Sequence, residues 1–399
     1  MPWLKVEPMD ERFRFIVEVQ RGRHDISELC RQFGISRKTG HKWLGRFEAQ
    51  GADGLRDASR APRFCPHKTN AAIEKQIIEL RMRWPTWGPR KLAAKLLRQG
   101  TEPPAASTIG DIIMRAGLVD PRNTRQRGKV SSWSQALTKP QRPNDVWAVD
   151  FKGWFRTRDG RTCHPLTVSD LYSRYLLGCS PLGDQRRASA EREFDVIFER
   201  YGLPEKIRVD NGSPFGSTGP CGLTRLSVRW LRHGIGVEFI RPGHPQDNGS
   251  HERMHKTLKA EAARPPEANL AKQALRLERW RHEFNTERPH EALGQRPPAE
   301  VYHPSSRTVA GNFRDFEYPR WYEKRRVRDD GMIQWRGDYR FVGQAFAGSN
   351  VGLIEGAGGD HDVYLGDLLL GILGDKGQCG LIPRGSARTG PAQTCPGKV

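Results

Sequence analysis

The sequence predicts a multidomain α+β protein with a helical N-terminal part, a mixed α/β middle and a β-rich end. Apolar residues recur at helical spacing through the first 118 residues. From residue 145 onward, short extended runs alternate with helical runs, and after about residue 310 only short extended runs remain. The length of 399 residues is enough for two to four domains of roughly 100–200 residues each.

A large excess of positive charge is the main feature of the composition. Lys and Arg number 66 and Asp and Glu 46, which gives a net charge of +20 and a pI near 10.0. Residues 1–144 hold 28 of the basic residues and 14 of the acidic ones, so this N-terminal part carries most of the excess. Such a surface favours a polyanionic partner, bound with strong salt dependence. The alternative is a basic surface that serves only to keep the protein dissolved.

Several protein classes are excluded by what the sequence lacks. No stretch reaches the roughly 18 apolar residues of a membrane span, because the most apolar late run, 363–373, is interrupted by Asp367. The first residues are charged where a secretory signal would be apolar. An odd number of cysteines without a C-x-x-C pair argues against a disulfide framework and a structural zinc site, and favours the reducing cytoplasm. The seven cysteines are at positions 30, 65, 163, 179, 221, 379 and 395.

Residues 1–60 are expected to form a helix-turn-helix unit. A first helix at 11–20 is followed by Asp25, which can cap a second helix with Glu28 as its capping-box partner. Gly34 suits a tight turn, and Ser36 can cap a third helix. Exposed polar residues that suit phosphates and guanine edges open this third helix: Arg37, Lys38, His41 and Lys42. Three-helix units with no role in DNA binding share this pattern, which is the alternative.

Residues 61–118 are expected to form a second helical module, which is either a second DNA-contacting unit or a spacer with a Trp-filled core. Pro-rich breaks separate its three helical runs: 73–82, 90–97 and 107–116. Residues 119–144 then predict a basic linker with almost no apolar periodicity. This linker either lies along a DNA backbone or stays a solvated coil.

Residues 145–305 change to a mixed pattern. Three antiparallel strands are predicted by extended runs at 146–156, up to 168 and at 175–179, with a hairpin turn at Asp159-Gly160. Helices and short strands then alternate. The helices are predicted at 188–201, 223–233, 250–262 and 270–285, and the strands at 206–210 and 237–240. This order of elements is that of a ribonuclease-H-like α/β domain.

Residues 306–375 contain closely spaced short extended runs, which predict a small β-barrel. The runs are 332–335, 339–342, 351–355, 362–365 and 368–373. Residues 376–399 are rich in Gly, Pro and Arg, and we expect them to form a disordered tail.

Three acids stand out by their position in the middle part. Asp150 lies on a strand that should be well buried, Asp210 follows another strand directly, and Glu252 lies in the first turn of a helix. A buried carboxylate is costly unless a cation compensates it, and three that meet would repel one another. Two Mg²⁺ ions would solve this problem, because hard cations take carboxylate oxygens and such an ion pair catalyses phosphoryl transfer.

Each acid also has an ordinary structural interpretation. Asp150 can be a strand-end acid that is bonded to a neighbouring amide, and Asp210 can open an Asp-Asn-Gly turn. Glu252 can be a first-turn acid that the helix dipole favours. Their joint occurrence in this order of elements favours the metal site.

The strings around these acids resemble a known family. They read WAVDFKG at 147–153, RVDNGSPF at 208–215 and HPQDNGSHER at 244–253, and a further match is WGPRKL at 87–92. They are similar to the integrase core of bacterial insertion-sequence transposases of the DDE type, which are related to retroviral integrases. The resemblance implies that Asp150, Asp210 and Glu252 are the catalytic, metal-binding acids. The supporting residues in the same strings are Asn211, Asn248 and Arg253.

The predicted helix of Glu252 also carries cations. His255, Lys256 and Lys259 follow Glu252 by three, four and seven residues, so we expect them on one face, where they would bind DNA phosphates. The alternative is a surface ion pair between Glu252 and Lys256. The Gly-rich stretch 216–222 is expected to be a surface loop that lengthens the interval between Asp210 and Glu252.

The resemblance implies a transposase that cleaves DNA to expose a 3′ hydroxyl and joins that end to target DNA. Mg²⁺ is the expected cofactor, with two ions, and Mn²⁺ should substitute. Double-stranded DNA, as the terminal inverted repeats and the target, is the expected partner. A homo-oligomer in the synaptic complex and a cytoplasmic, nucleoid-associated location without membrane contact are also expected. The alternatives are a ribonuclease-H-like nuclease without strand transfer and a non-catalytic helix-turn-helix regulator.

Overall fold

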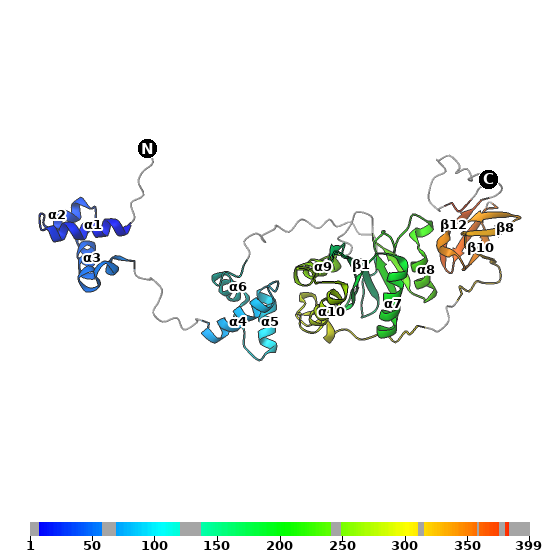
Figure 1. The fold of residues 1–399 in the computed structure, drawn as a ribbon, viewed down its shortest axis with the longest axis horizontal. Helices are drawn as coiled ribbons and strands as arrows, with labels where there is room; N and C mark the ends of the chain where they lie inside the picture. The colour runs from blue at the N-terminus through cyan, green and yellow to red at the C-terminus, as the bar shows by residue number, and fades with distance from the viewer. Residues whose placement is uncertain are drawn as a thin grey trace, which may run out of the picture. The chain divides into compact units, whose positions relative to one another are not determined.

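The computed structural model describes residues 8–57, 69–119, 137–240, 249–309, 315–356, 359–374 and 380–382. The chain folds as two units, Met1–Thr69 and Asn70–Val399. Helices occupy the beginning of the chain, a mixed α/β fold the middle and strands the end, as the colours of Figure 1 show. The predicted fold class is therefore confirmed for the helical and α/β parts.

The first unit is a three-helix fold closed by a short 3₁₀ turn. Its helices are α1 (Pro8–Arg21), α2 (Ile26–Gln32) and α3 (Arg37–Gln50). Both predicted caps are present, because the Asp25 side chain accepts from Ser27 N and the Ser36 side chain from Thr39 N. Gly34 turns the chain between α2 and α3 with a φ of 65°. The buried apolar core is formed by Phe15, Ile16, Leu29, Cys30, Trp43 and Leu55.

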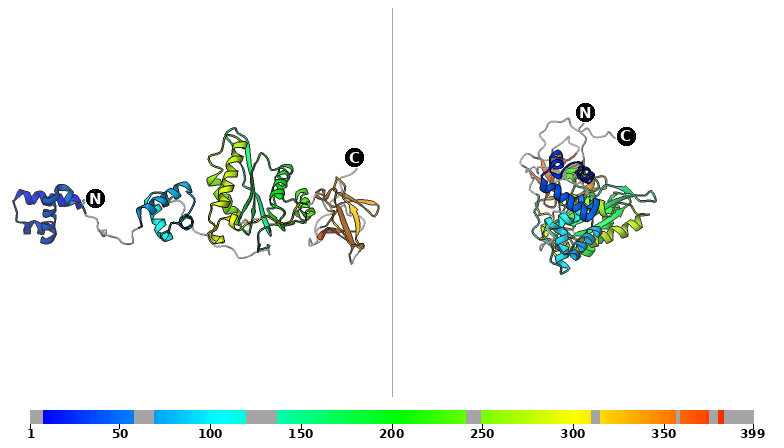
Figure 2. Two further views of the ribbon diagram at one scale, coloured as in Figure 1. Left: turned by 90° about the horizontal axis from the view of Figure 1, so that it is seen from below. Right: turned by 90° about the vertical axis from the view of Figure 1, so that its left-hand side faces the viewer.

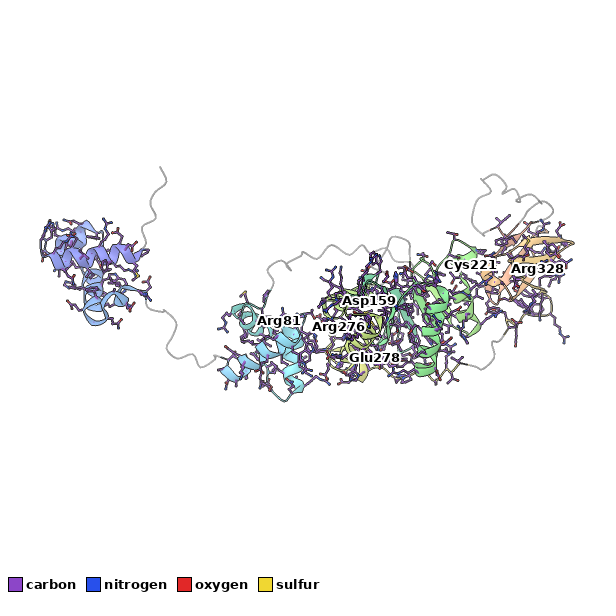
Figure 3. All side chains as sticks on the ribbon, viewed as in Figure 1. Arg81, Asp159, Cys221, Arg276, Glu278 and Arg328 are labelled. Carbon is purple, nitrogen blue, oxygen red and sulfur yellow. The ribbon has the colours of Figure 1, made fainter. Side chains whose placement is uncertain are left out.

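The second unit begins with the helical module α4–α6. Its helices are α4 (Ala71–Arg83), α5 (Pro89–Arg98) and α6 (Ala106–Arg115). Trp84 and Trp87 are buried and stack with ring centroids 4.3 Å apart, so the module has a core that contains both tryptophans. Arg81, labelled in Figure 3, donates to the Trp87 and Leu118 carbonyls and so ties the end of α4 to the turn before α5 and to the chain after α6.

A central mixed sheet follows, with strands in the order β2-β3-β1-β5-β6 and β4 paired with β3. The strands are β1 (Val146–Phe151), β2 (Phe155–Arg156), β3 (Thr162–Asp170), β4 (Leu176–Leu182), β5 (Lys206–Val209) and β6 (Gly236–Phe239). β3 pairs antiparallel with β1 and β4, whereas β1, β5 and β6 are parallel. The run predicted as one strand at 146–156 is two strands, because the chain turns at Gly153 with a φ of 68°.

Helices cover both faces of this sheet, as Figures 1 and 2 show. The helices are α7 (Arg187–Tyr201), α8 (Arg225–Arg232), α9 (Gly249–Glu261) and α10 (Leu270–Thr286). One apolar cluster joins Trp147 and Val149 of β1 to α7 and α8. A second joins Leu176 and Cys179 of β4 to α9 and α10. Because alternate residues of a strand face opposite sides, Asp150 faces the side opposite Trp147 and Val149.

The end of the predicted linker packs against the outer parallel strands. Thr138 accepts from Arg208 through its carbonyl at 2.6 Å, and its hydroxyl donates to Glu238. The predicted linker segment 120–136 lies outside the described residues.

The C-terminal part forms two small sheets. A four-stranded antiparallel sheet runs in the order β12-β11-β10-β7, and β8 and β9 form a hairpin. The strands are β7 (Glu323–Arg326), β8 (Met332–Trp335), β9 (Asp338–Phe341), β10 (Asn350–Glu355), β11 (His361–Leu365) and β12 (Leu368–Leu373). Isolated bridges at Gly380 and Ile382 reach β9 and β12. The predicted closed barrel is not confirmed, since the strand pairing in the described part gives these separate sheets.

The C-terminal sheets share an apolar cluster with the middle part of the chain. Leu223 and Val228 pack with Phe346, Val351 and Leu353 in this cluster. The Gly-rich stretch 216–222 reaches the same region, where the Cys221 thiol, labelled in Figure 3, donates to the Leu369 carbonyl at 3.3 Å. The stretch expected to be a plain surface loop therefore contacts the C-terminal part. No helix in the described ranges is long and apolar enough to cross a membrane.

Candidate catalytic site

The sheet brings Asp150 and Asp210 to neighbouring strand ends. β1 and β5 are parallel neighbours, and their last recorded pair is Ala148 with Arg208. Asp150 and Asp210 each lie two residues further along, so both are at the carboxyl edge of the sheet. The Asp210 side chain accepts from Gly212 N at 3.2 Å, which fits the turn that the sequence predicts.

Glu252 lies in the first turn of α9, and its negative charge acts on Asp150. Met254 and Leu258 hold this helix in the apolar cluster on one face of the sheet. The Glu252 side chain is exposed, whereas about 29% of the Asp150 side chain is accessible. Glu252 is therefore the acid of the site that meets solvent most freely.

The charges of the three acids act on one another. Burial, followed by the negative charges of Asp210 and Glu252, raises the pKa of Asp150 to about 7. The backbone N–H of Phe151 and the charge of Lys152 act in the opposite direction. In the ranges that the structure covers, no group of three His, Cys, Asp or Glu side chains is close enough to hold a metal ion. The three acids thus form a region of shared negative potential rather than a closed set of ligands.

A buried polar network lies directly beside Asp150. Thr167 is the antiparallel partner of Asp150, and its hydroxyl donates to the Asp150 carbonyl at 2.9 Å. The same hydroxyl oxygen lies 2.8 Å from His251 Nε2 and 2.7 Å from His255 Nε2. Ser169 Oγ lies 2.8 Å from His251 Nδ1. Thr167, Ser169 and His251 were not identified from the sequence, although two polar residues at alternate positions of a buried strand are a signal for such a network.

The expected position of His255 is wrong. Its side chain is buried, 5% exposed, and burial lowers its pKa to about 2, so it is neutral and does not face DNA phosphates. Lys256 and Lys259 are exposed as expected. The physical reason is that residues 251, 254, 255 and 258 share the buried stripe of α9, and the exposed stripe is 252, 256 and 259.

The supporting residues have different surroundings. Asn211 Nδ2 donates to the Ile240 carbonyl at 2.7 Å and so ties the end of β5 to the end of β6. Arg253 is exposed. The pKa of Arg174 is lowered first by the burial of Arg174 and second by the positive charge of Arg253. Asn248 lies outside the described residues.

The expected DNA-reading residues lie together at the start of α3, in the first unit. All four of them are exposed: Arg37, Lys38, His41 and Lys42. The Lys42 ammonium lies 4.6 Å from the centroid of the Trp43 ring, so its stem covers part of that buried side chain.

Comparisons with family models find two kinds of domain in this chain. An integrase core domain matches residues 140–245 and again 233–298. A helix-turn-helix domain matches residues 11–63, and a homeodomain-like domain matches residues 39–113.

Curated relatives include two insertion-element proteins. The uncharacterized 31.7 kDa protein of insertion element IS407 from Burkholderia multivorans is 26% identical over 284 residues, which are 70% of this chain and 92% of that protein. The uncharacterized 39.2 kDa protein of insertion element IS476 from Xanthomonas euvesicatoria is 28% identical over 270 residues, 67% of this chain and 75% of that protein.

Among solved structures, the HTLV-2 integrase catalytic core domain in complex with magnesium is 15% identical with a TM-score of 0.33. It covers 41% of this chain and 100% of its own. A simian T-cell lymphotropic virus intasome chain is 12% identical with a TM-score of 0.37. This match covers 73% of the present chain and 97% of the intasome chain. The family models and curated relatives confirm the resemblance noted from the sequence: residues 140–298 match integrase core models, residues 11–63 match a helix-turn-helix model, and the chain is similar to proteins of bacterial insertion elements.

Proposed function

We propose that the protein is a DDE transposase, which binds the ends of its insertion sequence, cleaves DNA and joins the free 3′ end to target DNA. The observation that carries this proposal is the position of Asp150 and Asp210 at neighbouring strand ends, with the charge of Glu252 acting on Asp150. An integrase core in a relative of insertion-element proteins supports DNA transposition or integration in general.

The donor set fits divalent metal ions. Carboxylate oxygens are the ligands that Mg²⁺ and Mn²⁺ accept, and Asp150 is a largely buried carboxylate beside two like charges. Asp150, Asp210 and Glu252 would hold two such ions. When bound, the ions supply activation of the attacking oxygen and stabilisation of the leaving one.

The other residues have roles that need no covalent intermediate with the protein. Water and then the 3′ hydroxyl are the nucleophiles, so neither Ser213 nor Tyr201 attacks DNA, and the Tyr201 hydroxyl accepts from buried Arg281. Lys256, Lys259 and Arg253 are exposed beside Glu252, where they would bind phosphates that flank the cleaved bond. The residues at the start of α3 would read the terminal inverted repeats, and synapsis of two ends would need a homo-oligomer.

Substitution of the acids tests the proposal. Asp150→Ala, Asp210→Ala and Glu252→Ala should each abolish Mg²⁺-dependent cleavage and joining, while the protein still binds the ends of its element. Glu199→Ala is the matched control, because Glu199 is an exposed acid on α7. Near-normal joining by one of the three variants would remove that residue from the site. Cleavage without any joining by the wild-type protein would favour the nuclease, and binding without cleavage the regulator.

A further inference from the structure

One buried hydroxyl connects the strand of Asp150 to the helix of Glu252. Thr167 of β3 is fully buried and bonds to the Asp150 carbonyl on one side and to both His251 and His255 on the other. The two histidines are 1% and 5% exposed and belong to α9. A single oxygen atom therefore contacts both the strand that carries Asp150 and the helix that carries Glu252.

The donors and acceptors of this network can be assigned. The Thr167 hydroxyl has one hydrogen, and the Asp150 carbonyl can only accept, so that hydrogen goes to the carbonyl. The hydroxyl oxygen must then accept from both histidines, each of which carries its hydrogen on Nε2. Both rings are almost fully buried, at 1% and 5% exposure, and such surroundings favour the neutral imidazole.

The assignment of the two Nε2 hydrogens fixes the remaining ring nitrogens. In a neutral imidazole the other nitrogen carries a lone pair, so His251 Nδ1 accepts from the Ser169 hydroxyl. His255 Nδ1 directs its lone pair toward Asp150 Oδ2, 3.6 Å away. This lone pair adds to the negative potential around Asp150, which favours a cation there.

We propose that Thr167, His251 and His255 are positioning residues that set α9, and with it Glu252, against the strand of Asp150. The inference rests on the proposed function, because it takes Asp150 and Glu252 as catalytic acids. Residues 251 and 255 are one helical turn apart, so two bonds to one hydroxyl fix both the rotation and the axial position of α9. The apolar contacts of Met254 and Leu258 are not directional and do not set this register alone.

The tautomers can be measured without any activity assay. Long-range ¹H–¹⁵N NMR of the full chain with ¹⁵N-labelled histidine distinguishes a ring with its hydrogen on Nε2 from one with it on Nδ1. Both buried histidines should carry the hydrogen on Nε2, and their signals should disappear singly in His251→Gln and His255→Gln. A hydrogen on Nδ1 of either ring would overturn the assignment, whether or not the protein is a transposase.

Paired substitutions test the positioning role. Thr167→Ser keeps the hydroxyl, whereas Thr167→Val keeps the shape and removes it. His255→Gln keeps an N–H near the Nε2 position, whereas His255→Asn is too short to reach Thr167. Exposed His282→Gln on α10 is the control. The readouts are Mn²⁺ affinity by electron paramagnetic resonance, the Mg²⁺ concentration for half-maximal joining, and the unfolding temperature.

Loss of the hydrogen bond should weaken metal binding by about 10–100-fold in Thr167→Val and His255→Asn. Thr167→Ser and His255→Gln should keep most of the metal affinity, and the control His282→Gln should not change the metal affinity. A lower unfolding temperature with unchanged Mn²⁺ affinity would overturn the proposal, because the network would then be merely structural. If Mn²⁺ affinity responds as expected but no variant or wild-type protein joins DNA, the positioning role stands and the proposed function fails.

Discussion

At the scale of single residues, Asp150 differs from an ordinary surface carboxylate in its surroundings. Asp150 is largely buried, and two further negative charges act on it. A carboxylate in such surroundings is unfavourable without a compensating cation, and oxygen ligands select hard divalent ions. Several divalent metal ions should therefore bind the site, but only some of them should support cleavage and joining.

This leads to a prediction about metal replacement. Removal of Mg²⁺ by a chelator should abolish joining, and Mn²⁺ should restore it. Ca²⁺ should support DNA binding but little cleavage, because it is larger and more loosely coordinated. Cleavage and joining in each metal, measured beside a gel shift for binding, check this. Equal rates in Ca²⁺ and Mg²⁺ would contradict the role assigned to the acids.

A second prediction concerns the pH dependence of stability. Burial, and then the charges of Lys91, Arg288 and Arg174, lowers the pKa of His290 to about 3. The unfolded chain binds a proton near pH 6.5 and the folded chain does not, so this stability is present above pH 6.5 and is lost as the pH falls toward 3. The loss between pH 6.5 and pH 4.5 should be about 1–3 kcal/mol.

Urea unfolding at pH 6.5 and pH 4.5 measures this loss of folding stability. His290→Gln should remove about one third of the pH dependence, because buried His251 and His255 lose stability in the same range, and exposed His282→Gln should leave it unchanged. An unaltered pH dependence in His290→Gln would show that other groups carry the acid sensitivity.

The residue scale also shows where the sequence was sufficient and where it was not. The three acids could be found because each interrupts or follows an apolar run, and their strings resemble a family. His255 was misplaced because a histidine can be either an exposed cation or a buried neutral hydrogen-bond donor. Only the partner on β3, Thr167, decides between them, and that partner is 88 residues away in the chain.

At the scale of elements, local capping signals predicted the helices of the first unit well. Asp25 and Ser36 cap α2 and α3 as expected, because their side chains bond to backbone groups two or three residues away. Strand β7 was missed because its sequence is Glu-Lys-Arg-Arg, which carries no apolar alternation, and it lies at the edge of its sheet. Its pairing with β10 is a tertiary property that no local pattern contains.

The exposed start of α3 gives a prediction about DNA recognition. Arg37→Ala should cost about 1–3 kcal/mol of binding and relax specificity at one base position. Lys42→Ala should weaken binding to all DNA sequences alike, and it should lower the slope of log affinity against log salt concentration by about one unit. Arg14→Ala is the control, since Arg14 is an exposed cation of α1 that pairs with Glu11.

Gel shifts on the element's ends at several salt concentrations separate the two effects. Because Lys42 also covers Trp43, the unfolding temperature of Lys42→Ala must be measured alongside. An Arg37→Ala variant that keeps its full preference for the element's ends would remove Arg37 from base reading.

At the scale of the whole second unit, the described chain uses two kinds of contact. The C-terminal sheets share an apolar cluster with Leu223 and Val228, so hydrophobic burial holds them. The apolar cluster of α4–α6, in contrast, contains residues of that module alone. Polar pairs link this module to glutamates further along the chain: Arg90 with Glu291 at 2.7 Å, Lys95 with Glu287, Arg98 with Glu300, and Thr86 with Glu261.

The two contacts should therefore respond differently to salt. Exposed ion pairs contribute about 0–1 kcal/mol each, and at about 1 M salt the Debye length falls to roughly 3 Å. Hydrogen exchange in segments 86–98 and 287–300 should rise between low and high salt, while segments 223–231 and 346–353 should stay protected. A charge exchange gives the sharpest test: Lys95→Glu or Glu287→Lys alone should increase exchange in both segments at low salt, because each places like charges together. The double variant should restore protection, because the pair is complementary again. If the double variant exchanges as fast as the single ones, the charge pair does not hold the module, and shape or apolar contact must do so instead.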